Sequence, residues 1–304
     1  MQPYERLENA FAEFAIKEHA ISCNTGTAGL HLALLALNIS EGDEVIVCDF
    51  VMAACAFAIS YVGATPIVVD CDENLNIDVS KIREKVSSKT KAIMAVHTYG
   101  RECNMKIICN IAKEFDIKVI VDMSEAHGIS CTGDIAVYSL YRNKIVCAEE
   151  GGMIVTNNKV YADKMRDLKN MAFGKVHNFF HSEIGYNYRM SNLQAELALN
   201  SLKDIKDNLS KRKQVNDWYN EYLGHFVEHD VDWVHDFLVE NNSIVDKLPE
   251  ARYFFKPISS FPMYSGKEGY AYEISKHGMY LPIDPTYTKE KVKDICKRYT
   301  QLSC

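Results

Sequence analysis

The sequence predicts an α/β fold in which helices cover both faces of a mostly parallel β-sheet. Short apolar runs alternate with segments of helical periodicity through much of the chain, a rhythm typical of parallel sheets. The 304 residues contain enough apolar side chains to bury one large core and a smaller one. We place the large domain at residues 1–208 and a small C-terminal domain at residues 209–304.

The expected elements follow from the periodicity of apolar residues. Leu7, Phe11 and Phe14 recur at helical spacing, which predicts an amphipathic helix over Tyr4–His19. After a turn of small residues, an apolar helix is expected over Leu30–Leu37. Strand and helix segments then alternate as Val45–Cys48, Met52–Val62, Pro66–Asp70, Asp78–Val86, Ala92–Val96, Ile107–Phe115 and Lys118–Asp122. Two further strands are expected, from Ile135 to Ser139 and over Met153–Thr156.

The later part of the chain is more helical and then mixed. Long helical patterns cover Val160–Met171 and Asn192–Leu209, and the pattern continues over Lys211–Trp218. The remainder mixes short strands and helices, including Gly278–Pro282 and a helix over Thr288–Tyr299, and we assign it to the small domain.

Composition narrows the classes of function. The formal net charge of −7 at pH 7 is evenly spread, which argues against nucleic acid or an anionic membrane as the main partner. No apolar run is long enough to span a bilayer, and the N-terminus lacks a signal segment. The ten cysteines form no CxxC pair, so we expect no metal site. Cysteines in apolar, strand-like runs (Cys48, Cys131, Cys147) indicate reduced, buried thiols in a cytoplasmic protein.

One lysine stands where a strand ends. Lys144 follows the apolar run that ends at Ser139 and precedes an acidic, glycine-rich turn at Glu149–Gly152. A buried, deprotonated amine beside a serine that faces a phosphate is what an enzyme needs to capture an aldehyde. Taken alone, the segment fits a surface lysine better, so the functional interpretation depends on its context.

The context supplies the other groups that a pyridoxal phosphate site requires. Asp122, at the end of a buried strand, could face the ring nitrogen, although a turn or helix-cap role explains it alone. Gly26 and Thr27 open a helix, where free backbone N–H groups suit a phosphate, and a plain helix start is the alternative. Ligands in such sheets bind at the carboxyl ends of the strands, where Asp122, Lys144 and His97 all lie.

Several motifs carry a resemblance to a known family. They are Asn24-Thr-Gly-Thr-Ala-Gly-Leu, Gly42-Asp-Glu-Val-Ile-Val, Val96-His-Thr-Tyr-Gly, Val121-Asp-Met-Ser-Glu-Ala-His-Gly, Ser139-Leu-Tyr-Arg-Asn-Lys, Glu150-Gly-Gly-Met-Ile-Val-Thr-Asn and Gly185-Tyr-Asn-Tyr-Arg-Met. These resemble signatures of the DegT/DnrJ/EryC1/StrS aminotransferases, fold type I enzymes that use pyridoxal 5′-phosphate to aminate nucleotide-linked keto sugars. Beyond Leu197 the resemblance thins to Phe255-Lys-Pro-Ile-Ser-Ser-Phe-Pro-Met-Tyr and Tyr280-Leu-Pro, which look most like the sugar 4-aminotransferases.

The resemblance implies a role for each matching position. Lys144 would bind the cofactor covalently and move a proton between cofactor and substrate, and Asp122 would pair with the ring nitrogen. Glu125 would lie near the ring hydroxyl, Met52 against the ring, and Gly26, Thr27 and Ser139 at the phosphate. The family places Asn187 at the cofactor phosphate of the neighbouring subunit and Arg189 near the sugar-nucleotide phosphates, which implies a homodimer with shared sites. His97 would lie near the cofactor or the sugar, and a core histidine is the alternative.

The implied reaction transfers an amino group from L-glutamate to a nucleotide-linked 4-keto-6-deoxy sugar. A dehydratase on the same scaffold is one alternative, although such relatives resemble this family with histidine in place of the lysine. A non-catalytic relative that keeps the fold for binding is another. The sequence does not distinguish GDP, UDP and dTDP as the nucleotide, nor the carbon that is aminated.

Some positions depart from the family pattern. Met52 stands where an aromatic side chain usually stacks on the ring, and Ser259 where a histidine is expected near the substrate. Glu149 replaces a glycine, which would add strain if the loop needs a positive φ there. The chain also begins late relative to the family, without most of the N-terminal segment that helps to close the sugar pocket.

Overall fold

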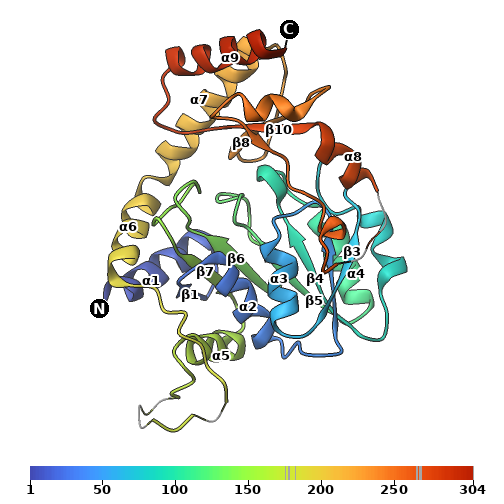
Figure 1. The fold of residues 1–304 in the computed structure, drawn as a ribbon. Coiled ribbons are helices and arrows are strands. Elements are labelled where there is room, and N and C mark those ends of the chain that lie inside the picture. Colours follow the sequence, from blue (N-terminus) through green and yellow to red (C-terminus); the bar gives the residue numbers. More distant parts are fainter. Residues whose placement is uncertain (175, 177–178, 182, 265, 267–268, 304) are drawn as a thin grey trace.

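The computed structural model describes residues 1–174, 176, 179–181, 183–264, 266 and 269–303. A seven-stranded sheet of order β1-β7-β6-β5-β4-β2-β3 forms its centre (Figure 1). The strands are β1 (His19–Cys23), β2 (Glu44–Cys48), β3 (Thr65–Val69), β4 (Thr90–Val96), β5 (Lys118–Asp122), β6 (Ile135–Ser139) and β7 (Gly152–Thr156). Neighbours from β3 across to β6 pair in parallel, and β7 pairs antiparallel with both β6 and β1. The predicted α/β fold with a mostly parallel sheet is confirmed.

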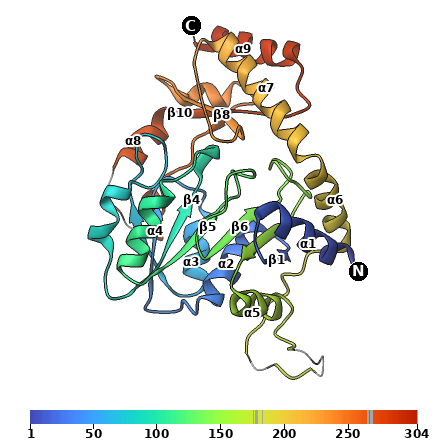
Figure 2. The same ribbon diagram turned by 180° about the vertical axis from the view of Figure 1, so that it is seen from behind.

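Helices cover both faces of this sheet. In the large domain they are α1 (Pro3–Ala15), α2 (Gly26–Ala36), α3 (Ala54–Tyr61), α4 (Met105–Glu114) and α5 (Lys159–Lys169). α2 and α3 lie on the face towards the viewer in Figure 1, and α4 lies on the face seen in Figure 2. Their apolar sides and the strands form one continuous core. In the described part of the chain, no helix combines the length and the apolar composition that crossing a membrane requires.

Two expected helices differ from the prediction. Asp78–Val86 forms two short 3-10 turns, η1 (Val79–Lys81) and η2 (Arg83–Lys85), because the Asp78 carboxylate accepts hydrogen bonds from the backbone and side chain of Ser80 and starts a tight turn. The pattern over Asn192–Leu209 is interrupted at Asp204, which separates α6 (Asn192–Lys203) from α7 (Ile205–Leu223).

The chain beyond α7 forms a second, smaller layer above the sheet in Figure 1. Its strands β8 (Val234–Leu238), β9 (Arg252–Tyr253) and β10 (Gly278–Pro282) pair antiparallel in the order β8-β10-β9. With α7 and α9 (Lys289–Ser303) they enclose a separate core, while α8 (Tyr270–His277) packs back on the main core. The predicted boundary after residue 208 falls inside α7 and stays a prediction.

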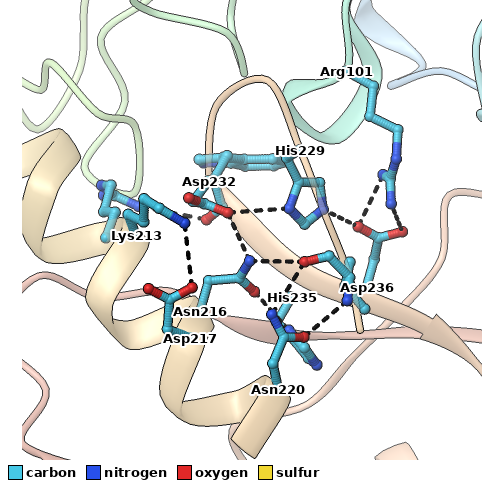
Figure 3. Close-up of polar contacts among 12 residues, drawn as sticks. Arg101, Lys213, Asn216, Asp217, Asn220, His229, Asp232, His235 and Asp236 are labelled. Carbon is cyan, nitrogen blue, oxygen red and sulfur yellow. Dashed lines mark hydrogen bonds and ion pairs between the residues drawn. The ribbon is translucent and has the colours of Figure 1, made fainter. Parts of the chain in front are cut away.

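A buried polar network ties the two layers together (Figure 3). Arg101, in the turn after β4, donates two hydrogen bonds to the Asp236 carboxylate in β8, at 2.9 and 3.0 Å. His229 lies between Asp236 (2.7 Å from Nε2) and Asp232 (3.3 Å from Nδ1). Burial lowers the pKa of His229, but these two carboxylates outweigh burial and leave the pKa raised. A protonated His229 therefore bridges two carboxylates and helps to fix the start of β8.

The loop between β6 and β7 contains Glu149, at which the sequence predicts strain if φ is positive. Glu149 has φ of +64°, in the left-handed region that favours glycine. Its carbonyl accepts a hydrogen bond from the backbone N–H of Arg142, so the conformation closes the loop that carries Lys144. The side chains of Arg142 and Glu149 form an ion pair at 3.4 Å that is largely exposed and worth little.

Replacing Glu149 by glycine is predicted to stabilise the protein by about 0.5–1 kcal/mol, because glycine adopts this φ without a Cβ clash. Urea unfolding measures the change. Glu149→Gln, which removes the charge and keeps the Cβ atom, serves as the control and should change the free energy of unfolding by less than about 0.5 kcal/mol. Equal stabilities for the glycine and glutamine variants would contradict the assignment of strain.

Replacing Asp236 by asparagine is predicted to cost about 3 kcal/mol of stability, because Arg101 and His229 would keep buried charges without their shared carboxylate. The same change at Asp207, whose ion pair with Lys211 on α7 is exposed, should cost less than about 0.5 kcal/mol. Chemical unfolding of both variants measures the free energy of unfolding. Similar losses at the two positions would contradict a larger contribution from the buried network.

Candidate active site

A cavity of about 400 Å³ opens where β4, β5 and β6 end. Seven of the predicted site residues line it: Gly26, Thr27, Met52, Asp122, Glu125, Ser139 and Lys144. They come from four separate stretches of sequence, which meet because parallel strands end at the same edge of the sheet. The structure does not bring His97, Asn187 or Arg189 of the same chain to this cavity.

Lys144 is held at the cavity by a loop that is fastened on several sides. His127, fully buried behind it, accepts a hydrogen bond from the Val146 N–H at 2.9 Å. The carbonyl of Ile145 accepts one from the Asn208 side chain on α7, and the carbonyl of Asn143 accepts one from the Trp233 indole at 3.0 Å. These contacts satisfy loop backbone groups that would otherwise be buried without partners. The amine is therefore positioned by residues up to 90 positions away in sequence.

The lysine amine lies between a carboxylate and an aromatic ring. Only 11% of the Lys144 side chain is exposed, and its Nζ is 3.5 Å from Glu125 Oε1 and 3.9 Å from the centre of the Trp233 ring. Burial lowers the pKa of Lys144 and outweighs the opposite effect of Glu125. Burial also raises the pKa of Glu125 to about 7, although Lys144 and the Tyr99 N–H, 2.8 Å from Glu125 Oε2, stabilise its charged form. Burial therefore shifts both groups of the pair towards their neutral forms, at a separation that allows a proton to pass between them.

Asp122 presents a carboxylate on the floor of the cavity. It ends β5, is 5% exposed, and accepts hydrogen bonds from the Ser124 N–H at 2.9 Å and the Cys55 thiol at 3.3 Å. These bonds fix the orientation of the carboxylate. The bond to Ser124, two residues on, is the turn contact of the alternative interpretation, whereas a helix cap does not apply because no helix follows β5 directly.

The start of α2 forms a cradle beside Ser139. Thr25 caps the helix by accepting the Ala28 N–H at 3.0 Å, which leaves the N–H groups of Gly26 and Thr27 at the cavity. A Cβ atom on Gly26 would lie 2.9 Å from the Ser139 Cβ, so only glycine allows the helix end to approach this strand end. Free N–H groups, the helix dipole and two hydroxyls together suit a phosphate.

The remaining predicted positions lie elsewhere. His97 is fully buried, accepts the Cys103 N–H at 3.1 Å and has its pKa lowered to about 4 by burial, as in the alternative of a core histidine. Asn187 and Arg189 are exposed; Asn187 pairs with Asn170, and Arg189 donates to the same residue. Ser259 binds Asp49 through both its N–H and its hydroxyl, away from the cavity.

Sequence reasoning missed part of the cavity wall. Trp233, Tyr280 and Phe255 line it from the small-domain side, and Tyr141 and Ser124 line it from the strand ends. The isolated tryptophan, one of two in the chain, was the available signal for Trp233, but nothing in its neighbourhood links it to Lys144.

The residues present fit pyridoxal 5′-phosphate. The cradle at Gly26, which a Cβ atom would fill, has room and hydrogen-bond donors for the phosphate. The buried Asp122 carboxylate could pair with a protonated ring nitrogen, and the Lys144 amine could bind the aldehyde carbon. Met52, which is 52% exposed, lines the wall where a ring would lie and offers a thioether contact in place of an aromatic stack.

Comparisons with known proteins agree with this geometry. The model of the DegT/DnrJ/EryC1/StrS aminotransferase family matches residues 2–300. GDP-perosamine synthase from Escherichia coli O157:H7 is 38% identical over 98% of this chain and 89% of the relative, and the enzyme of that name from Caulobacter vibrioides is 41% identical over 71% and 61%.

Solved structures show the same fold. DesV from S. venezuelae superposes with a TM-score of 0.91 over 100% of this chain and 90% of that chain, at 23% identity. The predicted fold type I architecture, the aminotransferase activity and the pyridoxal 5′-phosphate cofactor are therefore confirmed. The chain belongs to the DegT/DnrJ/EryC1/StrS aminotransferase family.

Proposed function

We propose that this aminotransferase moves the amino group of L-glutamate to a nucleotide-linked 4-keto-6-deoxy sugar. The buried Lys144 amine, held beside Glu125 and close to Asp122 and the start of α2, is the observation that carries the proposal. The substrate class is supported by relatives named GDP-perosamine synthase and dTDP-3-amino-3,6-dideoxy-α-D-galactopyranose transaminase, the latter 38% identical over 71% of this chain. The nucleotides in these two names are GDP and dTDP.

Six of the residues that line the cavity would each have a task in this reaction. Pyridoxal phosphate supplies the electron sink that makes the amino-acid C–H bond acidic. Asp122 would accept a hydrogen bond from the ring nitrogen and keep it protonated, while Gly26, Thr27 and Ser139 would bind the phosphate. Lys144 would act as nucleophile and then as the base that moves the proton, and burial, which lowers its pKa, favours the neutral amine that both steps need. Glu125, 3.5 Å away, can take up or return that proton.

A homodimer with shared sites is part of the proposal. Asn187 and Arg189 lie away from the Lys144 cavity of their own chain, so the roles suggested for them require a second subunit. They follow a stretch after α5 whose described residues include exposed apolar side chains, with Val176 66% and Ile184 81% exposed. Exposed apolar groups of this size favour a protein contact.

A cytoplasmic location is proposed from the state of the cysteines. The nine described cysteines are all free, which is usual where thiols stay reduced. Cys48 lies in β2 as expected, whereas Cys131 and Cys147 lie in loops and are only partly buried, contrary to the sequence interpretation. The dehydratase alternative receives no support, because Lys144 is present and the relatives named above are a synthase and a transaminase.

Replacing Lys144 by alanine is predicted to abolish amination. Purified protein would be incubated with pyridoxal phosphate, L-glutamate and a panel of GDP-, UDP- and dTDP-linked 4-keto-6-deoxy sugars, and aminated products detected by mass spectrometry. We expect one member of the panel to be aminated by the wild type and none by the variant. Wild-type protein that aminates no member would refute the proposed substrate class, and an active variant would refute the role of Lys144.

Replacing Glu125 by glutamine is predicted to remove a pH dependence of stability. The folded state binds a proton on Glu125 up to about pH 7, whereas the unfolded state releases it near pH 4.5, so wild-type stability falls as the pH rises through this window. Relative to the wild type, the variant should therefore gain up to about 1.4 kcal/mol per pH unit. Urea unfolding of cofactor-free protein at pH 5 and pH 7 measures this, with the exposed Glu84→Gln as control; parallel profiles for wild type and Glu125→Gln would contradict it.

A further inference from the structure

A second cavity, of about 510 Å³, adjoins the active-site cavity on the side of the small domain. The two share Asn143, Lys144, Trp233 and Tyr280 as lining residues. The second cavity then extends to the middle of α7, the loop before β9 and the loop after β10. The proposed amination gives this second cavity no role.

Arg212 on α7 lines this cavity with a buried charge that makes no direct ion pair with any described residue. It is 4% exposed, and its guanidinium donates to Asn208 Oδ1 at 2.8 Å and to the carbonyls of Ile283 and Trp233 at 2.6 and 3.4 Å. All these acceptors are neutral, and the carboxylates of Asp284 and Asp232 act on Arg212 only from beyond ion-pair distance. Burial lowers the pKa of Arg212 to about 10, which leaves it protonated at neutral pH. A buried charge without an ionic partner is costly, and an anion in the cavity would offset that cost.

The other charged groups of the cavity leave it cationic. Arg252, which also lines the cavity, donates to the carbonyls of Pro249 and Ala251 and forms no ion pair with a described residue. Of the two acids that line the cavity, Glu250 forms ion pairs with Arg298 and Lys291. Neither of these two cations lines the cavity. Asp284 accepts the N–H and the hydroxyl of Thr286 at 2.9 and 2.7 Å. Among the described lining residues, Arg212 and Arg252 are therefore balanced only by the Asp284 carboxylate, because Glu250 is already paired and Lys144 faces Glu125.

We propose that this second cavity binds a small oxyanion, a carboxylate or a phosphate, between the guanidinium groups of Arg212 and Arg252. Planar guanidinium groups bind both anions through paired, charge-assisted hydrogen bonds. A carboxylate would come from the dicarboxylic amino donor, an assignment that rests on the proposed function. A phosphate would come from a phosphorylated ligand or from free phosphate.

The position of the site couples the bound anion to Lys144. The positive charge of Arg212 is one of the causes, after burial, that lower the pKa of Lys144. An anion on Arg212 offsets that charge and stabilises protonated amine, so binding raises the pH at which the lysine–cofactor group titrates. The amino donor would then adjust the acidity of the base that serves it.

Calorimetric titration of the cofactor-loaded protein with glutarate and, separately, with inorganic phosphate tests the site. We expect saturable binding of at least one anion, weakened roughly tenfold or more by Arg252→Met and by Arg212→Met, because each removes a charged hydrogen-bond donor. Arg252 is exposed, so its variant keeps the test valid if Arg212→Met fails to fold. Arg83→Met, at an exposed ion pair with Glu114, is the matched control and should bind as the wild type does.

The outcomes distinguish a carboxylate from a phosphate as the bound anion. They also distinguish the oxyanion site from the proposed amination. Preference for glutarate assigns the site to the amino donor, and preference for phosphate assigns it to a phosphorylated ligand; both support an oxyanion site. In the wild type the bound anion should also raise the pH midpoint of the lysine–cofactor absorbance, and this shift should vanish in Arg252→Met. Binding that neither substitution weakens, or no saturable binding at millimolar anion, would overturn the inference. Because binding is measured without turnover, failure to aminate a sugar leaves this test unaffected.

Discussion

The contact between the Lys144 amine and the Glu125 carboxylate is the interaction on which the rest of the site depends. In water such a pair would be worth little, but here the lysine side chain is 11% exposed and the carboxylate 5%, so each group controls the charge of the other. The surroundings of the pair serve to keep it in place. His127, Asn208 and Trp233 fasten the lysine loop, and the Tyr99 N–H fixes the carboxylate.

The link between the two layers of the protein protects this arrangement. Trp233 reaches Lys144 from the residue before β8, and β8 is fastened to the large domain by the bond between Arg101 and Asp236. Tyr99, which holds Glu125, lies two residues before Arg101 and has φ of +54°, so the same strained turn serves both contacts. Movement of the small domain would therefore alter both sides of the lysine–carboxylate pair at once. The neighbouring cationic cavity lies at this junction, where a bound anion can act on Lys144 without touching the cofactor cradle.

Much of the fold and of the site could be predicted because the signals are local. Alternating apolar runs identify parallel strands, and polar residues directly after those strands, such as Asp122 and Ser139, must meet at one edge of the sheet. The positive φ of Glu149 was also predictable, since it depends on a turn within one loop. Trp233 and Arg212 were not, because their roles depend on how a distant layer docks on the sheet. His97 follows a strand as Asp122 does, yet packing turns it into the core, where its Nδ1 accepts the Cys103 N–H.

The covalent bond between Lys144 and the cofactor is the central claim, and it can be trapped. Protein loaded with pyridoxal phosphate would be treated with sodium borohydride, digested and mapped by mass spectrometry, with L-glutamate added before reduction in a parallel sample. The account predicts that the reduced cofactor is attached to the peptide containing Lys144, and that glutamate removes this label by releasing the amine. A label on another lysine, or no label on a protein that retains the cofactor, would contradict it.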